Sequence, residues 1–199
     1  MAKVMPVEKP LPVGSAGNRS GGWWGVMALI ATEGSLFVYL LFSYFYLGSQ
    51  TEQPWPPGGL PGLRIPGINT LLLLSSSGFV WASERWLRNR QPHWSLASMG
   101  IASLLGAAFV LIQLNEWQKK PYDMNSHLYG SLYFTITGFH LLHVALGLAI
   151  LILLLIWIAL GYFDHRRYAA VTIGGLYWHF VDVVWLFVFS TLYLLPYLY

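Results

Sequence analysis

Histidine and carboxylate side chains recur at helical spacing in the two most C-terminal apolar stretches of the sequence. His140 and His143 are three residues apart, and His179 and Asp182 repeat this spacing. Residues three apart lie on one face of a helix, so two polar patches form that could face each other. Histidines from two helices can ligate a metal or the iron of a haem. The alternative is that these groups hydrogen-bond to one another and hold the helices together. This alternative is favoured, because the sequence does not place two histidines at matched depth with small residues nearby to make room for a haem.

Three glutamates are further candidates for proton chemistry or ion pairing. Glu33 lies about ten residues into its apolar stretch, where a carboxylate is costly unless it is protonated, paired or hydrated. It is therefore either a proton-handling or subunit-contact carboxyl, or a neutral acid hydrogen-bonded to a neighbouring helix. Glu84 lies beside three arginines and is typical of a solvated ion pair. Glu116 is expected at the membrane interface.

The composition excludes most other chemistry. Of the 199 residues, 56% are hydrophobic and 10% are charged, against about 25% charged in soluble domains. The absence of cysteine excludes disulfides, thiolate nucleophiles, iron–sulfur clusters and cysteine-ligated metals. No basic cluster is dense enough to predict nucleic-acid binding.

Five apolar stretches are long enough to cross a bilayer, which takes about 20 helical residues. They span approximately 23–47, 68–86, 94–114, 131–162 and 170–195. The proline- and glycine-rich segment 50–66 cannot sustain a helix, and Asn69 and Thr70 are predicted to cap the second helix. The sequence thus predicts an all-α integral membrane protein, with a polar tail at 1–22 and a bundle of five transmembrane helices at 23–199. The tail lacks the apolar run of a signal peptide.

Lysine and arginine predict the orientation of these helices. Eight of the eleven fall on the N-terminal side of the membrane: Lys3, Lys9, Arg19, Arg85, Arg88, Arg90, Arg166 and Arg167. The other side carries Arg64, Lys119 and Lys120. The N-terminus is therefore expected in the cytoplasm and the C-terminus outside.

Two blocks near the C-terminus are distinctive. They are GLYWHFVDVVWLFVFSTLYL at 175–194 and YGSLYFTITGFHLLHVALG at 129–147, with its G-F-H-x-x-H-V pattern. They resemble the last two helices of subunit III of haem-copper terminal oxidases, the cytochrome c and quinol oxidases. Blocks at 31–47, 67–82 and 111–130 resemble the same family in the same order, and Glu33 falls on its glutamate. Thr32 stands where the family commonly has serine.

The resemblance is to the short, five-helix bacterial type rather than to larger members with seven helices. The V-shaped lipid cleft of the larger members therefore cannot be carried over intact. The resemblance implies an accessory, non-redox subunit of a proton-translocating oxygen reductase in the inner (plasma) membrane. It would stabilise catalytic subunit I by direct contact, bind phospholipid and support proton uptake, while the haems and copper lie in partner subunits.

On this interpretation the chain has no catalytic, cofactor-binding or metal-ligating residue. The candidates for buried polar, proton-related or lipid-contact roles are Glu33, His140, His143, His179 and Asp182. Two alternatives remain open. One is an accessory subunit of a nitric oxide reductase with the same helix pattern. The other is a b-haem membrane anchor that uses His140, His143 and His179 as ligands.

Overall fold

The protein is built from five long helices. The computed structural model describes residues 21–52, 54–57, 59–163, 165 and 167–198. The helices are α1 (Gly21–Ser49), α2 (Arg64–Arg88), α3 (Pro92–Gln118), α4 (Leu128–Ala159) and α5 (Ala169–Phe189), and the described residues contain no strand. All five are long and apolar enough to cross a membrane. The predicted all-α, five-helix membrane protein is confirmed, whereas the predicted 1–22 tail lies almost wholly outside the described residues.

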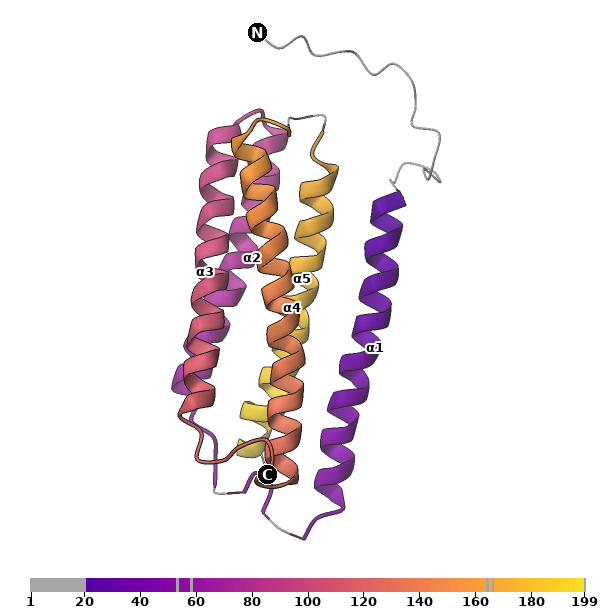
Figure 1. Ribbon diagram of the computed structural model, residues 1–199, viewed down its shortest axis with the longest axis vertical. Coiled ribbons are helices and arrows are strands. Elements are labelled where there is room, and N and C mark those ends of the chain that lie inside the picture. Colours follow the sequence, from indigo (N-terminus) through magenta and orange to yellow (C-terminus); the bar gives the residue numbers. More distant parts are fainter. Residues whose placement is uncertain (1–20, 53, 58, 164, 166, 199) are drawn as a thin grey trace.

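Four of the helices form a bundle and the fifth lies against its side. α2, α3, α4 and α5 run alternately up and down, each packing on the next, and α5 closes the bundle against α2 (Figure 1). Among the described residues, α1 packs mainly on α4 and α5 (Figure 1). The α2–α3 and α4–α5 connections meet at one end of the molecule, and the α1–α2 and α3–α4 connections meet at the other.

The second helix begins earlier than predicted. α2 starts at Arg64 and includes Pro66, because proline is tolerated in the first turn of a helix, where its missing N–H has no intrahelical partner. The prediction that Asn69 and Thr70 cap this helix is therefore wrong. Asn69 lies inside α2 and its Nδ2 donates to the Phe109 carbonyl of α3 at 3.4 Å.

The last helix changes form before it ends. α5 is α-helical to Phe189, becomes a π-helical turn over Ser190–Leu194 and finishes as a 3₁₀ turn at Leu195–Tyr197. Pro196 has no N–H and its ring would clash with the carbonyl four residues earlier in an α-helix. The last helix therefore ends near Pro196 as predicted, after a π-helical turn and a 3₁₀ turn.

Trp178 of α5 occupies the centre of the bundle. The side chain is fully buried, and its indole N–H donates to Ser76 Oγ of α2 at 2.9 Å. A Cβ added to Gly106 of α3 would lie 2.7 Å from the indole, and one added to Gly147 of α4 would lie 2.8 Å from it. Contacts this short do not occur, so both glycines are required for the indole to fit.

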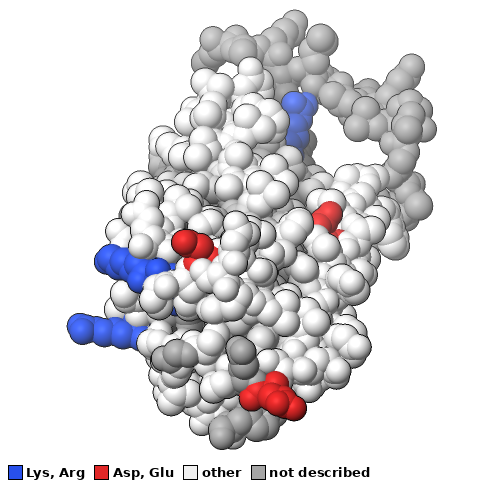
Figure 2. Space-filling model, turned by 60° about the horizontal axis from the view of Figure 1, so that its bottom comes forward, with Lys and Arg blue, Asp and Glu red and all other residues white. Residues whose placement is uncertain are grey.

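The outside of the molecule is suited to lipid. Figure 2 shows charged side chains that are few and scattered over a surface of uncharged residues. Large apolar side chains at mid-helix face outward, among them Val38 of α1 and Leu104 of α3, which are 69% and 73% exposed.

We predict that Gly147→Ala destabilises the protein by about 1–3 kcal/mol, the usual cost of overpacking a core, because the new methyl group would collide with Trp178. The melting temperature of the purified chain in detergent measures this effect. Gly100→Ala is the matched control, since its methyl group would meet only Leu155, at 4.0 Å. Equal melting temperatures for the two variants would contradict the central role of Trp178.

We also predict that the two loop ends of the bundle lie on opposite sides of the membrane, with the α2–α3 end in the cytoplasm. Asn89 and Asn125 are exposed at opposite ends, and the chain has no native cysteine. A membrane-impermeant maleimide should label Asn125→Cys in intact cells and Asn89→Cys only after the membrane is opened. Labelling of Asn89→Cys in intact cells would reverse the orientation.

Candidate functional site

The glutamate of α1 is paired with a histidine of α4. Glu33 Oε2 lies 3.1 Å from His143 Nε2, and His143 Nδ1 lies 2.6 Å from the Phe139 carbonyl oxygen. A carbonyl only accepts hydrogen bonds, so Nδ1 carries a proton and donates it. A hydrogen bond between Nε2 and the Glu33 carboxyl then needs one proton between them, carried by either side chain.

The other histidine of α4 points into the bundle. His140 is 1% exposed and stacks on the Trp185 ring at a centroid distance of 4.9 Å, with Phe109 at 5.9 Å and Phe37 at 6.2 Å. Neither ring nitrogen has a hydrogen-bond partner among the described residues. Aromatic rings of three different helices therefore surround this imidazole.

The polar groups of α5 turn toward α2 and not toward those of α4. Ser77 Oγ hydrogen-bonds His179 Nδ1. Asp182 is buried beside Ser77, yet neither of its oxygens has a hydrogen-bond partner in the described chain. The two predicted patches therefore do not come together: His143 reaches α1, His140 reaches the core, and His179 reaches α2.

Sequence reasoning missed one buried cluster of polar side chains, which surrounds Glu116. Glu116 lies two residues before the end of α3 and is only 7% exposed. Its Oε1 lies 2.9 Å from Lys120 Nζ and accepts from Tyr193 Oη at 3.0 Å and Tyr133 Oη at 3.4 Å. The Lys120 ammonium also lies over both tyrosine rings. The spacing of Glu116 and Lys120 by four residues is the one local signal for this arrangement.

Glu84 forms the ion pair expected of it, with Arg88. It is less solvated than expected, because Thr172 Oγ1 of α5 also donates to its Oε1 at 2.8 Å and its side chain is only 18% exposed. The Arg88 guanidinium lies 4.9 Å from the centre of the Tyr168 ring. This end of α2 is therefore fastened to α5.

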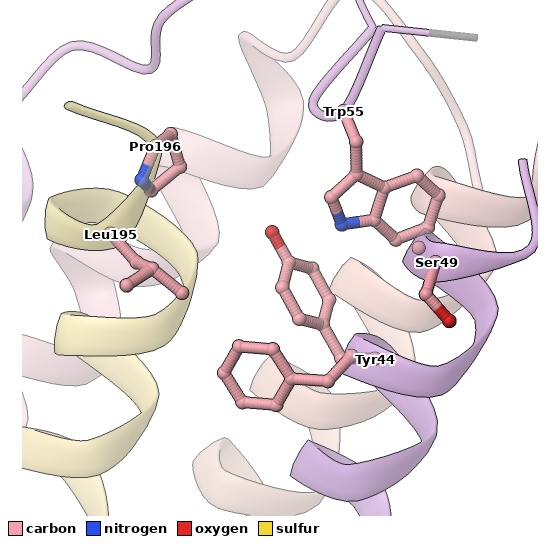
Figure 3. Close-up of a pocket in the computed structure, with 7 residues that line it drawn as sticks. Tyr44, Ser49, Trp55, Leu195 and Pro196 are labelled. Carbon is pink, nitrogen blue, oxygen red and sulfur yellow. The ribbon is translucent and has the colours of Figure 1, made fainter. Parts of the chain in front are cut away.

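Two cavities lie along α1, one toward each end. An apolar cavity of about 420 Å³ opens between α1, α4 and α5, and its lining includes Gly22, Gly25, Ile150 and Gly174. The second, of about 450 Å³, is lined by Tyr44, Phe45, Gly48, Ser49, Trp55, Leu195 and Pro196. Figure 3 shows Tyr44 and Trp55 facing Leu195 and Pro196 across it.

Aromatic side chains surround the second cavity. The lining is mostly apolar, with hydroxyl groups on Tyr44 and Ser49, and the Trp55 indole nitrogen is buried without a hydrogen-bond partner in the described chain. Tyr122, from the α3–α4 loop, packs on Tyr129 with ring centroids 5.9 Å apart. Burial raises the pKa of Tyr122 to about 12, so its hydroxyl stays neutral at physiological pH.

Metal ligation requires several donors at one point. Among the residues that the structure describes, no group of three or more histidine, aspartate or glutamate side chains is placed to hold a metal ion. The five candidate residues are instead spread over three separate contacts between helices.

Comparison with known proteins connects this arrangement to a family. The family model described as cytochrome c oxidase subunit III matches residues 15–197. The chain belongs to the cytochrome c oxidase subunit III family. Proteins named cytochrome c oxidase subunit 3 are similar to it at the level of about one residue in three. The relative in Synechocystis sp. is 33% identical over 186 residues, covering 92% of this chain and 79% of its own length. The relative in Homo sapiens is 34% identical over 184 residues, covering 88% and 70%.

Membership of the subunit III family makes this chain part of an oxidase complex in a membrane. The match begins before α1 and ends at Tyr197, so all five helices and every contact described above fall within it. The sequence blocks predicted this family correctly.

We predict that Glu33→Leu loosens α1, because His143 Nε2 would lose its partner at a cost of about 1–3 kcal/mol. Glu33→Gln keeps a polar group in reach of the imidazole and is the matched variant. Protease sensitivity of the α1–α2 loop in detergent should rise in Glu33→Leu and stay near that of the parent chain in Glu33→Gln. Equal sensitivity of Glu33→Leu and the parent would show that the pair does not hold α1.

Proposed function

We propose that this chain is the accessory, non-redox subunit of a respiratory haem-copper oxygen reductase, packed directly against the catalytic subunit I and stabilising it. The observation that carries the proposal is the Glu33–His143 pair. This pair joins α1 to α4, although a carboxyl and an imidazole could also serve in metal or proton chemistry. Membership of the subunit III family supports the assignment to an oxidase complex.

The residues of this chain do not fit the redox centres of such an oxidase. His140 is enclosed by aromatic rings, His143 uses both ring nitrogens in hydrogen bonds, and His179 Nδ1 is engaged by Ser77. These contacts argue against the b-haem anchor. Oxygen reduction would then take place at haems and copper held by the partner subunits.

Phospholipid binding is the second part of the proposal. The apolar cavity between α1, α4 and α5 matches acyl chains in chemistry, and the cavity at Trp55 adds the hydroxyl-bearing side chains of Tyr44 and Ser49, which suit an ester or phosphate oxygen. Both cavities border α1, whose main contacts in the described part of the chain are with α4 and α5. Lipid in these cavities would fill the contact between α1 and the bundle.

Support of proton uptake is the third part. The Glu33 carboxyl and the His143 imidazole lie 3.1 Å apart inside the membrane, and the Glu33 side chain is 30% exposed. Paired ionisable groups within membrane helices are typical of proton relays. We propose that the Glu33–His143 pair supports proton uptake by subunit I but does not itself conduct the protons that subunit I consumes.

We predict that an affinity tag on this chain purifies a complex that contains a haem-copper catalytic subunit with oxygen-reductase activity. Mass spectrometry of the subunits, haem analysis and oxygen consumption measure this. If the complex reduces nitric oxide but not oxygen, the chain is instead an accessory subunit of a nitric oxide reductase. Purification of the chain without a haem-bearing subunit would contradict the accessory role.

His179→Ala is a sharper test of the non-redox assignment within the same preparation. The variant removes the hydrogen bond to Ser77 and should release the chain more readily in detergent. Haem and copper per catalytic subunit should stay at the parent value, because no ligand is lost. Loss of haem while the chain remains bound would mean that His179 is a ligand.

A further inference from the structure

A line of polar side chains, here called the polar seam, follows the contact between α2 and α5. It consists of Ser77 and Glu84 of α2 and Thr172, His179 and Asp182 of α5. Thr172 donates to Glu84 at 2.8 Å, and Ser77 hydrogen-bonds His179. On each helix these positions recur at intervals of three or seven residues, so they stay on one face along the helix axis. The seam therefore leads from the Arg88 end of α2 toward the middle of the membrane.

The inner end of the seam lies at mid-membrane depth. Asp182 is the fourteenth residue of the 29-residue span Ala169–Tyr197, which places about 20 Å of helix on either side of it. His179 is one turn away and is half-buried. Lipid headgroups do not reach this depth, and acyl chains offer no hydrogen bond.

The seam is incompletely covered by this chain. The His179 imidazole is only half-buried at mid-membrane depth, whereas Asp182 is 3% exposed and lies beside Ser77 inside the chain. A polar group left unpaired in hydrocarbon is costly, so ionisable side chains in membrane helices face protein or water. The Glu33–His143 pair, in contrast, is closed within the chain.

The surface over the seam is open to a neighbour. Leu74 of α2 and Val183 of α5 flank it and are 37% and 51% exposed. A Cβ added at Gly78, next to Ser77, would meet nothing within 4 Å, and an exposed glycine lets another backbone approach closely. On α3, the exposed residues at the same depth, such as Leu104, are apolar.

We propose that a transmembrane helix of a neighbouring oxidase subunit packs over the polar seam and hydrogen-bonds the half-buried His179 imidazole at mid-membrane depth. The proposal rests on the proposed function, because it assigns a face to the contact between this chain and its complex. A protein helix is the occupant that the seam fits, since it brings hydrogen-bonding side chains to mid-membrane depth and lipid does not.

Photo-crosslinking from single cysteines tests which face is covered. The chain has no native cysteine, so Leu74→Cys and Val183→Cys can each carry a benzophenone maleimide in native membranes. Val38→Cys and Leu104→Cys are matched controls, because both are exposed apolar positions at mid-helix outside the seam. After irradiation, the tagged chain is purified and its adducts are identified by mass spectrometry.

We expect Leu74→Cys and Val183→Cys to crosslink to one and the same oxidase subunit, with lipid adducts predominating at Leu104→Cys. Lipid adducts alone at both seam positions, in a complex that still contains its haem-bearing subunit, would overturn the seam proposal and leave the proposed function standing. A purified chain that brings no haem-bearing subunit would overturn both.

Steric blocking gives an independent readout. Val183→Trp places a large side chain over the seam without entering the core of this chain, and Leu104→Trp does the same on α3. The fraction of chain retained with the haem-bearing subunit in detergent should fall about fivefold or more for Val183→Trp, which corresponds to the lower limit of overpacking costs. Leu104→Trp should be retained like the parent. Equal retention of the two variants would contradict docking at the seam.

Discussion

The indole of Trp178 sets the spacing of the four-helix bundle. Its ring takes the place that side chains of Gly106 and Gly147 would otherwise fill, and its N–H is satisfied by Ser76. A large ring that meets three helices at once fixes their separation more firmly than pairwise contacts do. The rings around His140 lie seven residues, or two helical turns, along α4 from Gly147.

The lack of water in the hydrocarbon explains most of the polar contacts. Indole, hydroxyl, imidazole and carboxyl groups in the described helices are joined across helices: Trp185 to Thr70, Ser83 to Ser95, Glu33 to His143, and Tyr193 to Glu116. His179 is only half-buried, so the outward part of its imidazole still requires a partner at this depth. A subunit of a larger complex can leave such a group for its neighbour to complete.

The sequence was sufficient for the helices and the family, but not for the partners of the polar residues. Apolar length identifies a membrane helix with little ambiguity, whereas the start of α2 depended on Pro66 fitting the first turn. Spacing by three residues left His140 and His143 about 60° apart around the helix, which is enough to send one to the core and the other to α1. The burial of Glu116 depends on tyrosines 17 and 77 positions away along the chain, and no local pattern reveals these.

The central claim is that the histidines and carboxyls of this chain join helices and complete contacts between subunits, while the redox centres lie elsewhere. The optical spectrum and metal content of the isolated chain, purified in detergent and incubated with haem, test this claim most directly. We predict no stoichiometric Soret band and no bound copper. A stoichiometric haem spectrum that is lost on replacing His140, His143 or His179 would contradict the account.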